Sequence, residues 1–204
     1  MKIAVFSDVH GNLKALKKVL EQIKEKNADE IIFLGDIFQR GNGEIECLDL
    51  LKESGAICIK GNCELYAANG VDIDPDVEYL REYYDGIRSR LSDEQMQFVK
   101  HMPLFFEKEY EGHKFLFSHF LFSNVEDAYP YLPLSSLKNG AFDEVCKSEN
   151  IKKYDLVVVG HCHQNFVKGN VVAVSATGLE DPSFLLIETN EDGLRVEHIK
   201  INIQ

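Results

Sequence analysis

Seven side chains with oxygen or nitrogen donor atoms follow short apolar runs of this sequence. The runs read IAVFS, IIFLG, ICIKG, FLFS and LVVVG. The donors are Asp8, His10, Asp36, Asn62, His119, His161 and His163. Imidazole and carboxylate groups together suit Mn, Fe, Zn, Ni or Co better than Ca. Seven donors are enough for two divalent ions, and paired metals are typical of sites that hydrolyse phosphoesters.

The spacing of these donors indicates how they could share ions. Asp8 and His10 are two positions apart, as are His161 and His163. On an extended segment such pairs project to the same side, so we expect each pair to face one metal site. Asp36 could bridge two cations. The neutral amide oxygen of Asn62 could bind a metal or orient a substrate phosphate.

The apolar runs themselves are the elements that must position these donors. Short runs rich in Val, Ile and Phe predict buried strands of a mostly parallel sheet. Ligands of such sheets gather at the carboxyl ends of the strands, so the donors are expected at one sheet edge. Strands are predicted at 2–7, 30–34 and 56–60, with helices between them. The first helix is predicted over Leu13–Ile23 with Asn12 as its cap, and the second around Ile45–Leu51, ended by Gly55.

The middle of the chain has a different pattern, and we expect a single domain over residues 1–204. Helical spacing predicts a mostly helical insertion near 66–102, with Asp74-Pro75 starting one helix and a Ser92/Gln95 capping box starting another. Strands are predicted near 104–110, 113–118 and 155–159, a long loop at 123–138 and a helix near 140–149. From 165 onward the alternation predicts antiparallel hairpins, with turns at 168–170 and 191–193.

Composition narrows the class of partner. The chain has 204 residues and a formal net charge of −12, which argues against binding of polymeric nucleic acid. A small phosphoester substrate remains compatible, because bound cations dominate the local field. The five cysteines form no CxxC pair, which favours reduced thiols and a cytoplasmic location. We expect no leader peptide and no membrane span, and nothing in the sequence indicates an oligomeric state.

The order of the donor motifs resembles that of one known family. The elements Asp8-Val9-His10, Gly35-Asp36, Gly61-Asn62, Ser118-His119 and 160–163 (GHCH) each follow an apolar run. In this order they resemble the calcineurin-like metallophosphoesterase superfamily, over residues 1 to about 190. The resemblance implies an α/β fold, a four-layer α/β/β/α sandwich of two mixed sheets. The hairpins after 165 would fit the second sheet.

The resemblance also implies a distribution of ligands and a mechanism. Asp8, His10, Asp36 and His163 would hold one divalent ion, and Asp36, Asn62, His119 and His161 the other. Mn is the first expectation, with Fe, Zn, Ni or Co as alternatives. A metal-bridging hydroxide would hydrolyse a small phosphodiester or phosphomonoester, so no catalytic residue is assigned beyond the metal ligands. A phosphoprotein phosphatase, a dinucleotide polyphosphate hydrolase and an inactive interaction scaffold remain as alternative functions.

The chain departs from the family pattern in several places. Cys63 occupies the position where many members have a histidine that helps protonate the leaving group, and a thiol is a poor replacement. Ser118 stands where a glycine is usual, and the segment 174–178 replaces an Asn-Pro-Gly-Ser stretch. The sequence around Arg40 echoes the GDxxxRG motif of phosphoprotein phosphatases and diadenosine tetraphosphate hydrolases, although Gln39 replaces the usual acidic residue. Arg40 is therefore predicted to bind the substrate phosphate. Asn62 is predicted to bind substrate as well, through its neutral amide.

Other conspicuous side chains favour structural roles. Cys162 is predicted to face away from the metal site, because strand-like side chains alternate. Three histidines match no motif and are interpreted as structural or surface residues: His101, His113 and His198. Four tyrosines are predicted to pack the inserted helices, with a substrate lid as the alternative: Tyr66, Tyr79, Tyr83 and Tyr84.

Overall fold

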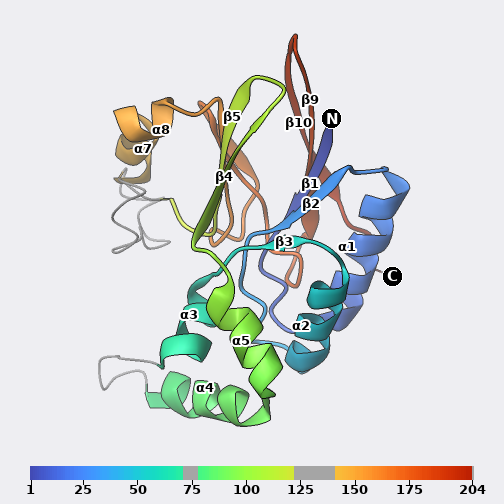
Figure 1. Ribbon diagram of the computed structural model, residues 1–204, viewed down its shortest axis with the longest axis vertical. Helices are drawn as coiled ribbons and strands as arrows, with labels where there is room; N and C mark the ends of the chain where they lie inside the picture. The colour runs from blue at the N-terminus through green and yellow to red at the C-terminus, as the bar shows by residue number, and fades with distance from the viewer. Residues whose placement is uncertain (71–77, 122–140, 204) are drawn as a thin grey trace.

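A computed structural model describes residues 1–70, 78–121 and 141–203 of the chain. It consists of two five-stranded mixed sheets with helices on their outer faces (Figure 1). The strand orders are β10-β9-β1-β2-β3 and β4-β5-β6-β8-β7. Helices α7 and α8 lie on one side of the molecule and α1 and α2 on the other, with the sheets between them. This arrangement confirms the predicted four-layer α/β/β/α sandwich.

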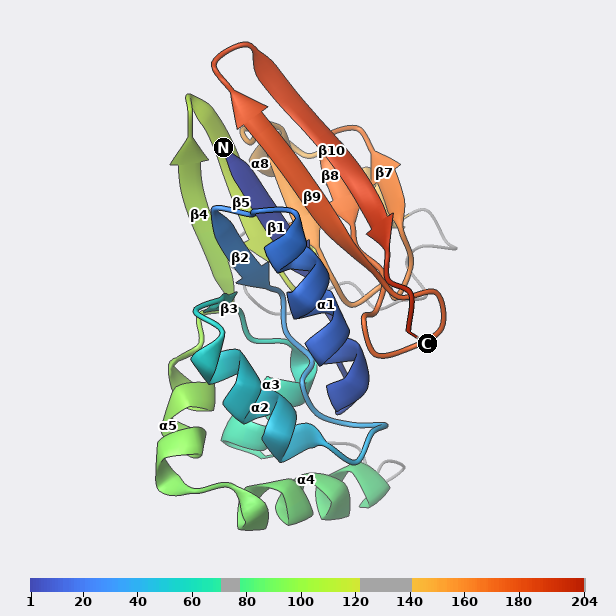
Figure 2. The same ribbon diagram turned by 90° about the vertical axis from the view of Figure 1, so that its right-hand side faces the viewer.

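The first sheet is built around β1. Strands β2 and β3 run parallel to it and β9 antiparallel, with β10 at the edge. In Figure 2, α1 (Leu13–Glu25) lies in front of this sheet and α2 (Glu44–Glu53) lies below it. Helix α1 buries one stripe of side chains, and the Asn12 side chain accepts a hydrogen bond from the Ala15 N–H as its cap. The strands are β1 (Lys2–Phe6), β2 (Glu30–Phe33), β3 (Ile57–Cys58), β9 (Ser183–Asn190) and β10 (Gly193–Lys200).

The second sheet has two parallel pairings in its middle. Strand β6 lies between β5 and β8 and runs parallel to both, while β4 and β7 form antiparallel edges. Two short helices, α7 (Ala141–Cys146) and α8 (Glu149–Lys152), cover its outer face. The strands are β4 (Phe105–Tyr110), β5 (His113–Ser118), β6 (Leu156–Val159), β7 (Phe166–Lys168) and β8 (Val171–Ala173).

The two sheets pack face to face through an apolar core. Val5 and Leu34 from the first sheet and Phe117 and Val158 from the second belong to this cluster and are buried. Burial of such side chains stabilises the pairing of the sheets by about 1.5–3 kcal/mol for each large apolar residue. The apolar runs that precede the candidate ligands therefore also supply the inter-sheet core.

Three helices connect the first sheet to the second. They are α3 (Asn62–Asn69), α4 (Glu78–Arg90) and α5 (Asp93–His101), and they gather at one end of the molecule (Figures 1 and 2). The Ser92/Gln95 capping box at the start of α5 is confirmed. The expected Asp74-Pro75 helix start and the loop at 123–138 lie outside the described residues.

Three expectations from the sequence were wrong in detail. The donors do not follow the strands of a single sheet, because β5 and β6 belong to the second one. Of the two hairpins after residue 165, β7–β8 lies in the second sheet as expected, but β9–β10 belongs to the first sheet, where β9 pairs with β1. The helix predicted near 140–149 is two helices, because Ser148 has extended backbone angles (φ −65°, ψ 149°) that a helix cannot continue.

The tyrosines of the insertion differ from one another. The Tyr84 ring is fully buried and contacts the rings of Tyr66 and Tyr83, which fits the packing interpretation. The Tyr79 side chain is 65% exposed and does not pack in this way.

Among the described residues, no helix combines the length and apolar character needed to cross a bilayer.

Candidate metal centre

The structure brings the seven predicted donors to one end of the two sheets. Each follows the carboxyl end of a strand: β1 and β2 lead to Asp8, His10 and Asp36, and β3 leads to Asn62 at the start of α3. Strands β5 and β6 of the second sheet lead to His119 and to the histidines at 161 and 163. Both sheets therefore supply side chains to the same small region.

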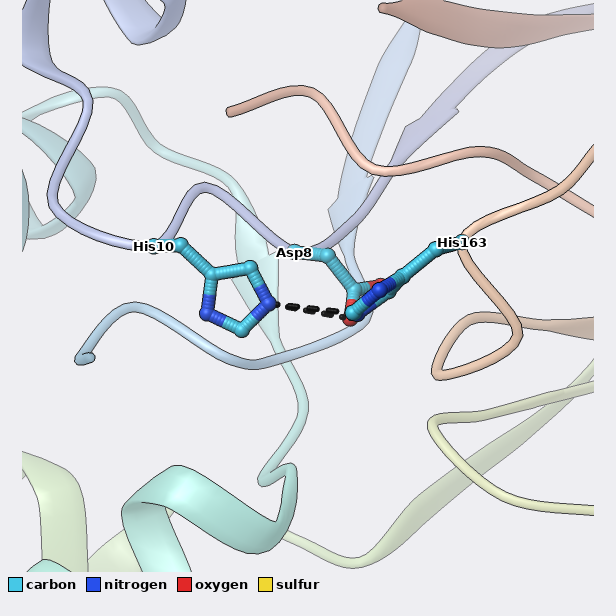
Figure 3. Close-up of side chains that lie close together, drawn as sticks. All are labelled: Asp8, His10 and His163. Carbon is cyan, nitrogen blue, oxygen red and sulfur yellow. Dashed lines mark hydrogen bonds and ion pairs between the residues drawn. The ribbon is translucent and has the colours of Figure 1, made fainter. Parts of the chain in front are cut away.

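One group of donors consists of Asp8, His10 and His163 (Figure 3). His163 Nε2 lies 3.0 Å from Asp8 Oδ1 and 3.2 Å from His10 Nε2. His10 Nε2 lies 3.7 Å from the same Asp8 oxygen. The three ligand atoms therefore converge closely enough to hold one cation.

A second group consists of Asp36, His119 and His161, whose ligand atoms all lie within 4.8 Å of one another. His119 Nε2 lies 3.5 Å from Asp36 Oδ2. Asp36 also forms a group with His10 and the Cys63 sulfur, again within 4.8 Å. Asp36 thus belongs to one group and also lies within reach of His10, a member of the other.

Left-handed backbone turns aim most of these side chains. The φ angles are positive at five of the seven donors: 56° at Asp8, 48° at His10, 65° at Asp36, 61° at His161 and 53° at His163. Asp and His tolerate this region better than most residues, and strained backbone concentrates at functional sites. The side chains of Asp8 and His10, and of His161 and His163, therefore do not converge by alternation along an extended segment, as the sequence suggested. Cys162 is nonetheless buried against the second sheet, as predicted.

Backbone carbonyls fix the orientation of two imidazole rings. His10 Nδ1 donates to the Phe38 carbonyl at 2.9 Å, and His119 Nδ1 donates to the Leu34 carbonyl at 2.8 Å. A carbonyl only accepts, so the proton resides on Nδ1 in each ring. In the neutral rings Nε2 then keeps a lone pair directed at the carboxylates, which is the form that a metal ion needs.

Each carboxylate is held by one oxygen. Asp8 Oδ2 accepts the His161 backbone N–H at 3.1 Å, and Asp36 Oδ1 accepts the Cys63 backbone N–H at 2.9 Å. The second oxygens, Asp8 Oδ1 and Asp36 Oδ2, face the imidazoles. The carboxylates are thus oriented before any ion binds.

Three donor atoms of the site are buried without a hydrogen-bond partner among the described residues. They are Asp8 Oδ1, Asn62 Oδ1 and His119 Nε2. Asp8 Oδ1 and His119 Nε2 face an ionisable neighbour, His163 and Asp36 respectively, without forming a well-aligned hydrogen bond. Unpartnered buried polar atoms cost stability and are rare in folded proteins. Because all three can coordinate metals and lie in or beside the two groups, the donor set fits divalent cations.

Close backbone approaches explain two glycines of the motifs. A Cβ atom at Gly61 would lie 2.3 Å from Asp36 Oδ1, and one at Gly160 would lie 2.1 Å from Ser7 Oγ and 3.0 Å from Asp8 Oδ2. Any larger residue would push the carboxylates out of place. The glycines before Asn62 and His161 are therefore part of the geometry of the site.

The sequence interpretation missed Glu64. This buried carboxylate accepts the backbone N–H groups of Asp36, Ile37 and Gly61, each at 2.8 Å. It joins the loop after β2 to the start of α3, and so sets the distance between Asp36 and Asn62. Its position three residues after the cap Gly61 was a detectable capping signal, but its bonds to Asp36 and Ile37 depend on tertiary structure.

The electrostatic field of the site favours positive charge. Burial would raise the pKa of the Asp36 carboxyl, but His119 and His10 hold it well below its usual range. Burial alone would lower the pKa of His119, but Asp36 and Asp8 raise it to about 9. Burial and the neighbouring His119 lower the pKa of His161 to about 4. Without a metal ion, a proton on His119 offsets part of the carboxylate charge.

The segment at 174–178 is hydrogen-bonded to the backbone around Asp8. The Thr177 N–H donates to the Ser7 carbonyl at 2.9 Å, and the Gly178 N–H donates to the Asp8 carbonyl at 3.0 Å. The Asn12 side chain donates to the Gly178 carbonyl at 3.0 Å. This segment therefore supports the backbone that carries Asp8 through main-chain contacts.

The remaining predicted residues occupy different surroundings. Arg40 is exposed and forms no ion pair with a described residue, and its neighbour Gly41 packs against the backbone of His10 and Gly11. The Cys63 thiol is fully buried beside the site. Three histidines lie in the fold with backbone partners away from the donor groups: His101 with Gln97, His113 with Asn190 and His198 with Ala173.

The chain is similar in sequence to two groups of known proteins. An uncharacterized protein of Methanocaldococcus jannaschii is 30% identical over 174 residues, covering 83% of this chain and 67% of that protein. A symmetrical bis(5'-nucleosyl)-tetraphosphatase of Coxiella burnetii is 29% identical over 103 residues, 49% of this chain and 35% of that one. The chain thus matches about a third of that enzyme's length.

The fold has a counterpart among solved structures. The crystal structure of a metallophosphoesterase from Sphaerobacter thermophilus matches with a TM-score of 0.65 and 20% sequence identity, over 99% of this chain and 89% of that one. The sequence model of the calcineurin-like phosphoesterases matches residues 1–165, which carry all seven donors. The chain therefore belongs to the calcineurin-like phosphoesterase family.

Proposed function

We propose that this protein is a dinuclear metal-dependent phosphoesterase that hydrolyses a small phosphodiester or phosphomonoester. The observation that carries the proposal is a set of three buried donor atoms, on Asp8, Asn62 and His119, that form no hydrogen bond among the described residues. They lie in or beside the two donor groups described above, and Asp36 is close to members of both groups. The mixture of nitrogen and oxygen donors suits Mn²⁺, with Fe, Zn, Ni or Co as alternatives.

The residues divide between two ions. Asp8, His10, Asp36 and His163 would hold the first, and a second set would hold the other: Asp36, Asn62, His119 and His161. Bound divalent ions supply Lewis acidity, which lowers the pKa of a coordinated water and offsets the charge of a phosphoryl group. The protein contributes pre-oriented side chains, because backbone groups hold His10, His119 and both carboxylates in place.

Cys63 bears on the choice of substrate. Burial raises the pKa of its thiol, and the nearby Asp36 and Glu64 carboxylates raise it further. A fully buried thiol that holds its proton so firmly is a poor donor to a leaving group. We therefore expect better turnover of esters with good leaving groups than of esters with poor ones.

Arg40 supports a more specific substrate class. Its exposed guanidinium lies in the loop that packs against His10, and it has no carboxylate partner among the described residues. Arginine binds phosphate through bidentate hydrogen bonds. Together with the similarity to the Coxiella tetraphosphatase, this favours a dinucleotide polyphosphate as the second candidate substrate.

An assay on metal-stripped protein reloaded with Mn²⁺ tests the proposal. Its three arms use p-nitrophenyl phosphate, bis-p-nitrophenyl phosphate and diadenosine tetraphosphate. Turnover should require metal and should fall by more than about 100-fold in Asp36→Asn, because removing a charged ligand costs both metal affinity and transition-state stabilisation.

The matched control is Asp192→Asn, which makes the same chemical change at an exposed turn. It should retain wild-type rates. Full activity in Asp36→Asn, or equal activity with and without metal, would contradict the mechanism. The relative rates in the three arms distinguish diester, monoester and dinucleotide polyphosphate cleavage.

A further inference from the structure

The peptide group between Phe38 and Gln39 is held from both sides. Its carbonyl accepts a hydrogen bond from His10 Nδ1 at 2.9 Å. Its N–H donates to the Tyr83 hydroxyl at 2.7 Å. A peptide group is planar, so a partner that fixes the N–H direction also fixes the carbonyl direction. The Tyr83 hydroxyl therefore constrains the atom that orients His10.

This peptide lies in a segment that needs external support. The φ angle is 74° at both Gln39 and Arg40, and neither residue type favours the left-handed region. The segment lies between β2 and α2, outside both elements. Two consecutive strained residues persist only where surrounding contacts over-determine them. The hydroxyl of Tyr83 is one of those contacts.

Tyr83 is itself anchored to a buried carboxylate. Its hydroxyl donates to Glu44 Oε1 at 2.7 Å. The Glu44 side chain is almost completely buried at the start of α2, and its other oxygen lies 3.6 Å from Arg90 Nη2. Tyr83 and Arg90 both belong to α4, so this helix contacts the loop of the metal centre through a polar cluster.

The three hydrogen bonds point in one direction. His10 Nδ1 donates to the Phe38–Gln39 peptide, the peptide donates to Tyr83, and Tyr83 donates to the Glu44 carboxylate. Hydrogen bonds in series polarise one another. Because the series ends in an anion, it makes the His10 ring a better electron donor at Nε2, the atom that faces Asp8 and His163.

We propose that Tyr83 is a positioning residue for the metal centre: through the Phe38–Gln39 peptide it orients His10 and increases the affinity of the His10 site for its cation. The inserted helix α4 thereby contributes to metal binding although it carries no ligand. This role rests on the proposed function, because it requires His10 to bind a metal ion.

A purely structural role for Tyr83 makes a different prediction. Helix α4 is also anchored by Tyr84 and Ile87, both fully buried. If the hydroxyl of Tyr83 only attached α4 to the core, its loss would lower overall stability and would weaken both cation sites alike. Selective weakening of one site is expected only from the hydrogen-bond series.

Calorimetric titration of the metal-stripped full chain with Mn²⁺ tests the proposal. Wild type is compared with Tyr83→Phe, which removes only the hydroxyl. The control is Tyr79→Phe, four residues earlier on the same helix, where the side chain is 65% exposed. One of two binding steps should weaken by about tenfold in Tyr83→Phe, in line with losses of outer partners of metal ligands. The other step, and the whole isotherm of Tyr79→Phe, should stay at wild-type values.

Glu44→Gln provides a second variant, because it keeps an acceptor for the Tyr83 hydroxyl and removes the terminal charge. It should weaken the same step by a smaller factor. An unchanged isotherm in Tyr83→Phe, or equal weakening of both steps with a lower unfolding midpoint, would overturn the positioning role of Tyr83. Either result would leave the proposed function untouched. Absence of Mn²⁺ binding by wild type would instead overturn the proposed function, and this inference with it.

Discussion

At the residue scale, the site depends on small polar groups that accept unusual backbone angles. Asp8, Asp36 and His163 combine positive φ angles with side chains that can bind a cation. Asp and His enter the left-handed region more readily than branched or bulky residues. The residue types that the chemistry needs are therefore also types that the sharp turns after the strands accept.

Glu64 shows how a residue without a ligand role can hold such turns together. Burial and the nearby Asp36 raise its pKa to about 7, although its three backbone N–H partners oppose this. The contacts with Asp36, Ile37 and Gly61 still satisfy donors that would otherwise be buried and unpaired.

Glu64→Gln should therefore destabilise the protein. The amide nitrogen of Gln cannot accept, so at least one of the three N–H groups loses its partner, at a cost of about 1–3 kcal/mol. Urea unfolding of the metal-stripped protein measures the change. The control, Glu53→Gln on the exposed surface of α2, should stay within about 0.5 kcal/mol of wild type. Equal stabilities of the two variants would refute this role for Glu64.

At the element scale, the helices of the insertion differ in how they bear on the site. Helix α3 begins at Asn62, so its N-terminus is part of the centre. Helix α4 carries no candidate ligand and acts through Tyr83 and its contact with Glu44. A substitution on the free surface of α4 should therefore change stability without changing the site.

Gly86→Ala is such a substitution. Gly86 lies inside α4, and an added Cβ would meet nothing within 4 Å. Alanine reduces the entropy lost on folding, so we expect a gain of about 0.5–1 kcal/mol. Thermal unfolding would measure it. Gly61→Ala should instead lose stability, because its Cβ would lie 2.3 Å from Asp36 Oδ1. A loss of stability in Gly86→Ala would contradict the prediction and would mean that α4 is packed differently.

At the scale of the whole molecule, the centre joins the two sheets. Asp8, Asp36 and Asn62 come from the first sheet, and His119 and His163 from the second. The His119 side chain also donates across the interface to the Leu34 carbonyl. Cations bound between these groups should hold the sheets together, because a ligand that binds only the folded state stabilises it.

The pH dependence of stability should report this connection. The pKa of His119 is raised from 6.5 to about 9 in the metal-free fold. Its contribution to stability is therefore fully present below pH 6.5 and is lost as the pH rises through 9. The free energy of unfolding of metal-stripped protein should fall over this range.

Denaturant titrations at several pH values would check the trend. In protein loaded with Mn²⁺ the ion takes the place of the proton, so the decline should disappear. It should also be absent from metal-stripped His119→Asn. A free energy of unfolding that rises with pH in the metal-free wild type would contradict the assigned direction of the shift.

The sequence by itself determined the strands, the donors and their order. Each donor follows an apolar run, and the runs at β1, β2, β5 and β6 form strands because short runs rich in Val, Ile and Phe favour the interior of a sheet. The caps of α1 and α5 were also predictable, since Asn12 and Ser92 act on backbone groups within a few residues.

Tertiary structure alone decided which sheet each strand joined and how the donors turned toward one another. Strand β9 lies beside β1 although about 180 residues separate them along the chain, and no local pattern specifies that pairing. The hydrogen bonds of Glu64 to Asp36 and of Tyr83 to Gln39 likewise join distant segments. Residue types set which contacts are chemically possible, whereas the packing of the two sheets and the inserted helices selects the contacts that form.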